Sequence, residues 1–126
     1  MRLLLLASAG GAIGAGARYL VSVGLMRWCA GDFPWATLTV NVVGCLLMGG
    51  LVAVFLRHWP EAPGLRIFLT TGILGGFTTF SAFAMEVIAL IERNASVAAA
   101  LYVAGSIVVS IAASVFGLWL VRATLA

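Results

Sequence analysis

The chain has 126 residues, of which 63% are hydrophobic and only 9% are charged, and its formal net charge is +3. An ordinary soluble domain is nearly half apolar and about a quarter charged, so this composition excludes a soluble globular domain. The seven basic residues are all arginine and, apart from Arg18, are spread over segment ends, which excludes the basic patch expected of a nucleic-acid-binding protein.

Four apolar segments are each long enough to cross a bilayer. The sequence therefore predicts an all-α membrane protein with one four-span domain over residues 1–126, with spans near residues 3–26, 35–56, 65–91 and 97–120. The start of the chain resembles a signal peptide, but its apolar character continues to Met26 and includes Arg18. We therefore predict an uncleaved first span.

The first span combines small residues with a charge. Gly10 and Gly14 form a small-xxx-small face, which favours close helix packing. Arg18 lies well inside the apolar run, where a charge costs about 3 kcal/mol or more. Two interpretations stay open: the side chain reaches toward the membrane surface, or it draws anions into a vestibule.

The second span contains Asn41, whose amide needs partners in an apolar medium. It either clamps two helices by hydrogen bonds or donates its NH2 group to an anion. A loop follows, marked by Pro60 and Pro63, before the third span begins.

The third span carries poor helix formers near its middle, namely Gly72, Gly75, Gly76, Thr78 and Thr79. We therefore predict that this helix is broken there. Backbone leaves a helix at membrane depth only where it is buried in protein or lines a cavity, so the break indicates a site.

Two phenylalanines and an acidic residue follow this weak stretch. Phe80 and Phe83 are three residues apart and share a helix face. Their positive ring edges would suit a small anion, although two phenylalanines in a membrane helix are also ordinary core. Glu86 follows one turn later, either pairing with an arginine or acting as a proton-linked group. The main alternative function is therefore a proton-coupled exporter of the small multidrug-resistance type.

The fourth span places Ser106, Ser110 and Ser114 on one face, because they are four residues apart. These hydroxyls either join helices or line a polar path. In the third span, unwound carbonyls at residues 75–78 of two chains would suit Na⁺ at a two-fold axis, although simple glycine packing is the other interpretation.

An even number of spans places both termini on one side of the membrane. Four arginines (Arg2, Arg57, Arg66 and Arg122) then fall on that side, and Arg27 and Arg93 on the other. This bias favours cytoplasmic termini only weakly. Insertion in both senses would permit an antiparallel dimer.

Three segments resemble the signature segments of the CrcB/Fluc fluoride channels: residues 10–19 (GGAIGAGARY), 37–44 (TLTVNVVG) and 72–83 (GILGGFTTFSAF). The resemblance implies a passive, fluoride-selective channel, not an enzyme, that exports cytoplasmic fluoride and protects against its toxicity. It also implies a dual-topology antiparallel homodimer with two pores in the bacterial cytoplasmic (inner) membrane. Passive flux is also the simplest expectation because the sequence holds no ATP-binding motif.

The same resemblance implies roles for individual residues. Gly75 and Thr78 of both subunits would hold a structural Na⁺ by their carbonyls. Arg18 would lie near an aqueous vestibule, and Glu86 near one pore end. The remaining residues expected to line or support the fluoride pore are Asn41, Phe80, Ser81, Phe83, Tyr102, Ser106 and Ser110. The family usually reads Phe-Ser-Thr-Phe at the end of the third segment, and Ala82 replaces that threonine here.

Overall fold

The computed structural model describes residues 1–29 and 31–125, which form α-helices and one π-helical turn with no strand among them. Four helical segments are long and apolar enough to span a membrane, as predicted: Arg2–Trp28, Trp35–His58, Pro63–Glu92 and Ser96–Thr124. Each runs one to four residues beyond one or both of its predicted bounds. In lipid every backbone polar group must be satisfied within the protein, so apolar segments of this length form helices.

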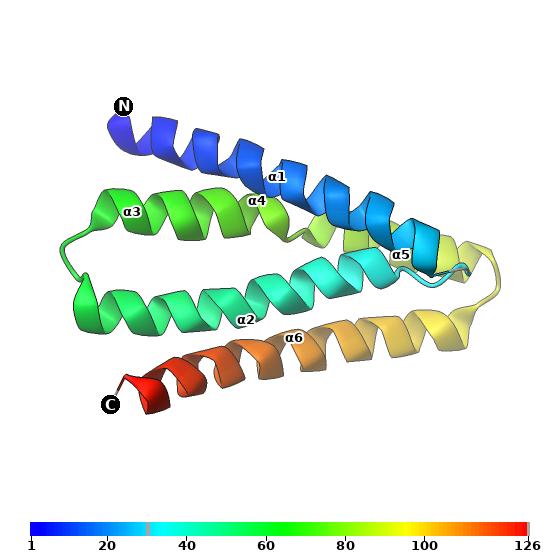
Figure 1. Ribbon diagram of the computed structural model, residues 1–126. Helices are drawn as coiled ribbons and strands as arrows, with labels where there is room; N and C mark the ends of the chain where they lie inside the picture. Colours follow the sequence, from blue (N-terminus) through cyan, green and yellow to red (C-terminus); the bar gives the residue numbers. More distant parts are fainter. Residues whose placement is uncertain (30, 126) are drawn as a thin grey trace.

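The spans form an antiparallel bundle (Figure 1). The first is α1 (Arg2–Trp28), the second is α2 (Trp35–His58) and the fourth is α6 (Ser96–Thr124). The third span is divided into α3 (Pro63–Ile67), the π-helical η1 (Phe68–Leu74), α4 (Gly75–Phe77) and α5 (Phe80–Glu92).

The connections define the two ends of the bundle. Both termini and the α2–α3 connection lie at one end, and the other two connections lie at the opposite end (Figure 1). At that opposite end, Nη1 of Arg93 lies 3.0 Å from Oδ1 of Asp32, which joins the two connections. Gly31 and Asn94 adopt positive φ angles of 138° and 58° in these turns, a region that glycine and asparagine tolerate.

Glycines bring the helices into backbone contact. A Cβ atom added to Gly49 of α2 would collide with the carbonyl oxygen of Ser114 on α6. A Cβ atom on Gly14 of α1 would likewise collide with the carbonyl oxygen of Ile73 in η1. Small residues are needed where membrane helices approach this closely, so the predicted Gly10–Gly14 face is a packing face.

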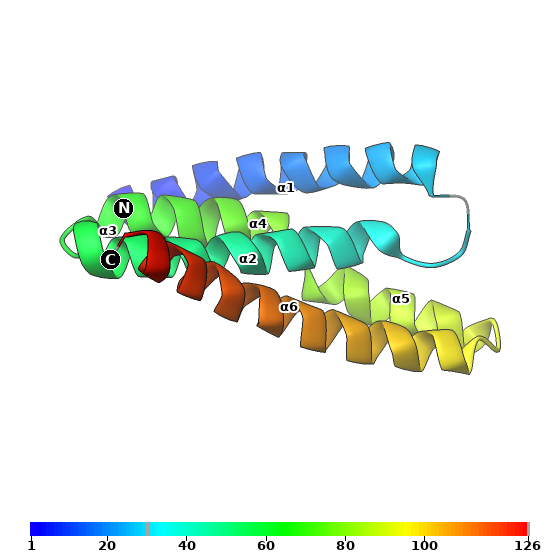
Figure 2. The ribbon, with the colours of Figure 1, turned by 60° about the horizontal axis from the view of Figure 1, so that its bottom comes forward.

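The third span changes its packing partner part way along. Its first half, η1 and α4, packs on α1, whereas α5 packs on α6 (Figure 2). Between these halves Thr78 (φ −81°, ψ 159°) and Thr79 (φ −153°, ψ 125°) have extended backbone. These two residues redirect the chain from one neighbouring helix to another, and they position the site.

Candidate functional site

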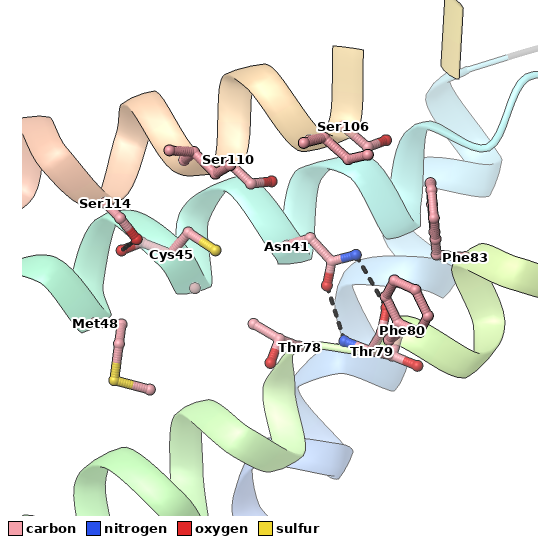
Figure 3. Close-up of a pocket in the computed structure, with 13 residues that line it drawn as sticks. Asn41, Cys45, Met48, Thr78, Thr79, Phe80, Phe83, Ser106, Ser110 and Ser114 are labelled. Carbon is pink, nitrogen blue, oxygen red and sulfur yellow. Dashed lines mark hydrogen bonds between the residues drawn. The ribbon is translucent and has the colours of Figure 1, made fainter. Parts of the chain in front are cut away.

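The extended backbone of Thr79 is paired with the side chain of Asn41 on α2 (Figure 3). The Thr79 N–H donates to Oδ1 of Asn41 at 2.8 Å, and Nδ2 of Asn41 donates to the Thr79 carbonyl at 3.0 Å. The amide thus replaces the helical bond of the Thr79 N–H, and it adds a donor to the Thr79 carbonyl, which as the N-cap of α5 also accepts the first bond of that helix. Of the two sequence interpretations of Asn41, the structure shows the clamp directly, and the second amide N–H is a further donor.

The threonine side chains complete the hydrogen bonding around this pair. The Thr78 hydroxyl donates to the Leu74 carbonyl at 2.9 Å. The Thr79 hydroxyl accepts from the Ala82 N–H at 3.3 Å and so caps the N-terminus of α5. This cap satisfies one of the donors that every helix start leaves unpaired.

These bonds affect the carbonyl groups of Gly75 and Thr78. In an unbroken helix their donors would be the N–H groups of Thr79 and Ala82, four residues later. Those two groups bond to Asn41 and to the Thr79 hydroxyl instead. The Gly75 and Thr78 carbonyls therefore lose their usual helical partners, and Gly75 lies exposed on the surface of the chain.

A cavity of about 410 Å³, here called the first cavity, lies between α2, the extended residues, α5 and α6 (Figure 3). Its polar lining consists of hydroxyls and one amide, and the rest is apolar or sulfur-bearing. The lining residues are Asn41, Gly44, Cys45, Met48, Thr78, Thr79, Phe80, Phe83, Ser106, Ile107, Ser110, Ile111 and Ser114. None of them carries a formal charge.

The serines that share one face of α6 differ in their hydrogen bonding at this cavity. Ser114 donates its hydroxyl to the Cys45 carbonyl at 2.9 Å and so joins α6 to α2. Ser106 is buried, and its Oγ has no hydrogen-bond partner within the part of the chain that the structure describes. Because buried hydroxyls are nearly always paired, the Ser106 hydroxyl is a candidate hydrogen-bonding group for a ligand in this cavity.

Phe80 and Phe83 both line the first cavity, with ring centroids 5.5 Å apart and planes inclined by 43°. Phe83 is buried, and its centroid lies 5.1 Å from that of Tyr102. Phe80 is 79% exposed. One ring therefore belongs to the interior of the chain, and the other faces out of it.

Glu86 joins three helices. Its Oε1 accepts from the Thr37 hydroxyl on α2 at 2.7 Å, and its Oε2 accepts from the Tyr102 hydroxyl on α6 at 2.6 Å. Hydrogen bonds to a carboxylate are short and strong. Thr37 was not assigned a role by the sequence analysis, although it lies one helical turn before Asn41 on the same face.

A second cavity of about 440 Å³ lies on the other side of the extended residues, between α1, α2 and α5. Arg18 and Glu86 both line it, with Thr37, Thr79 and Ala82. Thr79 lines both cavities and separates them. The hydroxyl that Ala82 lacks would belong to this second cavity.

The structure thus distributes the predicted pore residues over distinct places. Arg18 and Glu86 lie at the second cavity, and Tyr102 reaches both Glu86 and Phe83. Ser81 lies outside both cavities; it is exposed, with its hydroxyl 3.3 Å from that of Thr79. The others gather at the first cavity: Asn41, Phe80, Phe83, Ser106 and Ser110.

Comparison with known proteins agrees with the sequence resemblance. Residues 5–118 match the profile of the family described as "CrcB-like protein, Camphor Resistance (CrcB)". A protein of Rhodospirillum centenum is 49% identical over 126 residues, which is 100% of both chains. A protein of Agrobacterium fabrum is 50% identical over 117 residues, covering 93% of this chain and 94% of its own.

A protein of Nitrobacter winogradskyi is 45% identical over 119 residues, or 94% of each chain. All three relatives are named fluoride-specific ion channel FluC, so the proteins that this chain resembles are channels and not enzymes. The match covers almost all of the chain, including every residue of both cavities. The chain therefore belongs to the CrcB-like family of membrane proteins.

Proposed function

We propose that the protein is a passive, fluoride-selective channel of the bacterial cytoplasmic membrane. The observation that carries this proposal is the lining of the first cavity, which offers neutral donors and aromatic rings at membrane depth and no formal charge. Fluoride holds water tightly, so a selective path must replace that water with directed donors. Conduction also requires binding weak enough for the ion to leave, which neutral donors permit.

Four kinds of donor converge on this cavity. The second N–H of the Asn41 amide is left after its bond to Thr79, and the Ser106 hydroxyl has no partner among the described residues. Phe80 and Phe83 offer ring edges of positive potential. The helix α5 begins at Phe80, and the N-terminus of a helix attracts anions because of its unpaired N–H groups and the helix dipole.

The second cavity supplies an entrance in this proposal. Arg18 would raise the local concentration of anions there, and Glu86 would limit how tightly they bind. Fluoride would then pass Thr79, which lines both cavities, to reach the ring pair. An inside-negative potential drives an anion outward with about 2.3 kcal/mol per charge per 100 mV, so a passive channel exports fluoride and protects the cell.

An antiparallel homodimer with two pores is part of the proposal. Phe80 is 79% exposed on a single chain, at the edge of the first cavity, and a second copy would cover it. The arginines divide four to two between the bundle ends, a bias small enough for insertion in both senses.

A structural Na⁺ at the dimer centre fits the residues present. The Gly75 and Thr78 carbonyls lack their usual helical donors because those donors bond elsewhere. Carbonyls of broken membrane helices coordinate Na⁺ in transporters. In this proposal both carbonyls of each chain hold the ion, which would supply a fixed positive charge between the two copies and is not transported.

The exporter alternative is less well supported. Glu86 would have to bind and release protons during transport, yet both of its oxygens accept hydrogen bonds from hydroxyl groups. Membership of a family whose relatives are named ion channels also favours passive conduction.

The first prediction concerns selectivity. In liposomes carrying the protein and a potassium ionophore, we expect fluoride efflux, measured with an ion-selective electrode, to exceed chloride efflux by about 100-fold, or about 2.7 kcal/mol of barrier. Protein-free liposomes are the control. Equal chloride and fluoride rates would contradict the proposal, and proton-coupled cation uptake that disappears in Glu86→Gln would support the exporter.

The second prediction concerns the aromatic pair. Phe80→Ile and Phe83→Ile keep apolar bulk but remove the ring edges, so each should lower fluoride efflux by about tenfold, or about 1.4 kcal/mol of barrier. Phe116→Ile is the matched control, because Phe116 lies exposed on α6 and does not line the first cavity. Wild-type efflux in both cavity variants, with oligomer size unchanged by gel filtration, would remove the aromatic role.

The third prediction concerns sodium. Exchange of Na⁺ for N-methylglucamine at constant ionic strength should abolish fluoride efflux and lower the thermal unfolding midpoint, because an ion that binds only the native state stabilises it by mass action. Restoring Na⁺ should reverse both changes. Identical efflux and midpoint in the two buffers would leave glycine packing as the explanation for this region.

A further inference from the structure

A third cavity, here called the end cavity, lies at the end of the bundle that carries both termini. It has a volume of about 460 Å³ and opens between the last turns of α2 and α6. Ala53, Leu56, Val121 and Leu125 form its apolar wall. Arg57 of α2 and Arg122 of α6 provide its charge.

These two arginines have little competing negative charge nearby. Both side chains are exposed, and neither belongs to the one ion pair found among residues 1–29 and 31–125, which joins Arg93 to Asp32 at the opposite end. Within the same part of the chain, Glu61 is the only carboxylate side chain in the α2–α3 connection. The pair is therefore available to an external anion.

The two ends of the bundle differ in charge. Four arginines (Arg2, Arg57, Arg66 and Arg122) lie at the end with the termini, together with Glu61. At the opposite end Arg27 and Arg93 are balanced by Asp32 and Glu92. An anion that binds at a membrane boundary is therefore favoured at the end cavity and not at the other end.

The chemistry of the cavity indicates its ligand. A guanidinium group presents planar, paired donors that match the oxygens of a phosphate. A free inorganic anion would make no contact that uses the apolar wall. The glycerol and upper acyl carbons of a lipid, in contrast, would pack against it. Basic pockets between membrane helices bind anionic lipid head groups in this way.

We propose that the end cavity binds an anionic phospholipid, with its phosphate between Arg57 and Arg122 and its acyl chain against the apolar wall. The bound lipid joins the ends of α2 and α6. The same two helices form much of the wall of the first cavity, so the lipid would also stabilise the site. This proposal does not depend on which ion the protein conducts.

The test compares an anionic with a zwitterionic phospholipid, which share the phosphate and the acyl chains and differ in the head-group alcohol. Purified protein in neutral detergent is titrated with phosphatidylglycerol or phosphatidylcholine of identical acyl chains, and bound lipid is counted by native mass spectrometry. We expect saturable binding of phosphatidylglycerol about tenfold tighter than that of phosphatidylcholine, or about 1.4 kcal/mol. Arg57→Gln/Arg122→Gln should lose this preference.

Matched variants separate charge from position. Arg27→Gln removes an arginine at the opposite end and should keep the full preference. Arg57→Lys/Arg122→Lys keeps the charge but not the paired donors, so it should bind phosphatidylglycerol with intermediate affinity. Both cavity arginines are exposed. If the double glutamine variant does not fold, the two single glutamine variants provide a second test. Each should lose part of the preference for phosphatidylglycerol.

Three results would overturn the proposal. One is equal binding of the two lipids to the wild-type protein. Another is an unchanged preference in the folded glutamine variants. The third is displacement of bound phosphatidylglycerol by inorganic phosphate at similar concentration, which would show a general anion site instead of a lipid site.

Discussion

The site depends on one pair of hydrogen bonds, between the Asn41 side chain and the backbone of Thr79. Without Asn41 the Thr79 N–H would have no partner at membrane depth, which would cost about 1–3 kcal/mol, and the extended conformation would be unfavourable. With Asn41 in place, the third span leaves α1 and continues against α6. Everything at the first cavity follows from that change of direction: the start of α5, the position of Phe80 and Phe83, and the two carbonyls without helical donors.

Electrostatics explain why the two cavities divide the polar residues as they do. Arg18 and Glu86 lie together at the second cavity, where Arg18 would attract anions in the proposed channel. The first cavity holds only neutral donors, where a strongly attracting charge would trap a small anion. Thr37 and Tyr102 hold the Glu86 carboxyl group by both oxygens, so this group stays at one position between α2, α5 and α6. In the proposed channel, the residues that attract anions are therefore different from those that line their passage.

Structural features that depend on the local sequence pattern could be predicted from the sequence. Apolar run length indicated the four spans, and the glycines and threonines near Gly75 and Thr78 indicated where the third span is weak. Hydrogen-bond partners that are distant in sequence could not be predicted. Thr37 and Glu86, for example, are 49 positions apart, and the local pattern around either residue does not indicate that they form a hydrogen bond. The equivalent serines of α6 could not be separated for the same reason: Ser114 bonds to a carbonyl of α2, whereas Ser106 has no described partner. The names of the relatives support fluoride as the ion that we propose, which physical chemistry left open.

The most direct test of this account is fluoride efflux from liposomes that carry Asn41→Ala. Thr39→Ala is the matched control, because Thr39 lies on α2 two residues earlier and therefore on a different face. We predict that Asn41→Ala lowers efflux by about 100-fold, because it leaves the Thr79 N–H unpaired and removes the amide donor from the first cavity. Thr39→Ala should conduct like the wild type. Wild-type efflux through folded Asn41→Ala would contradict the account.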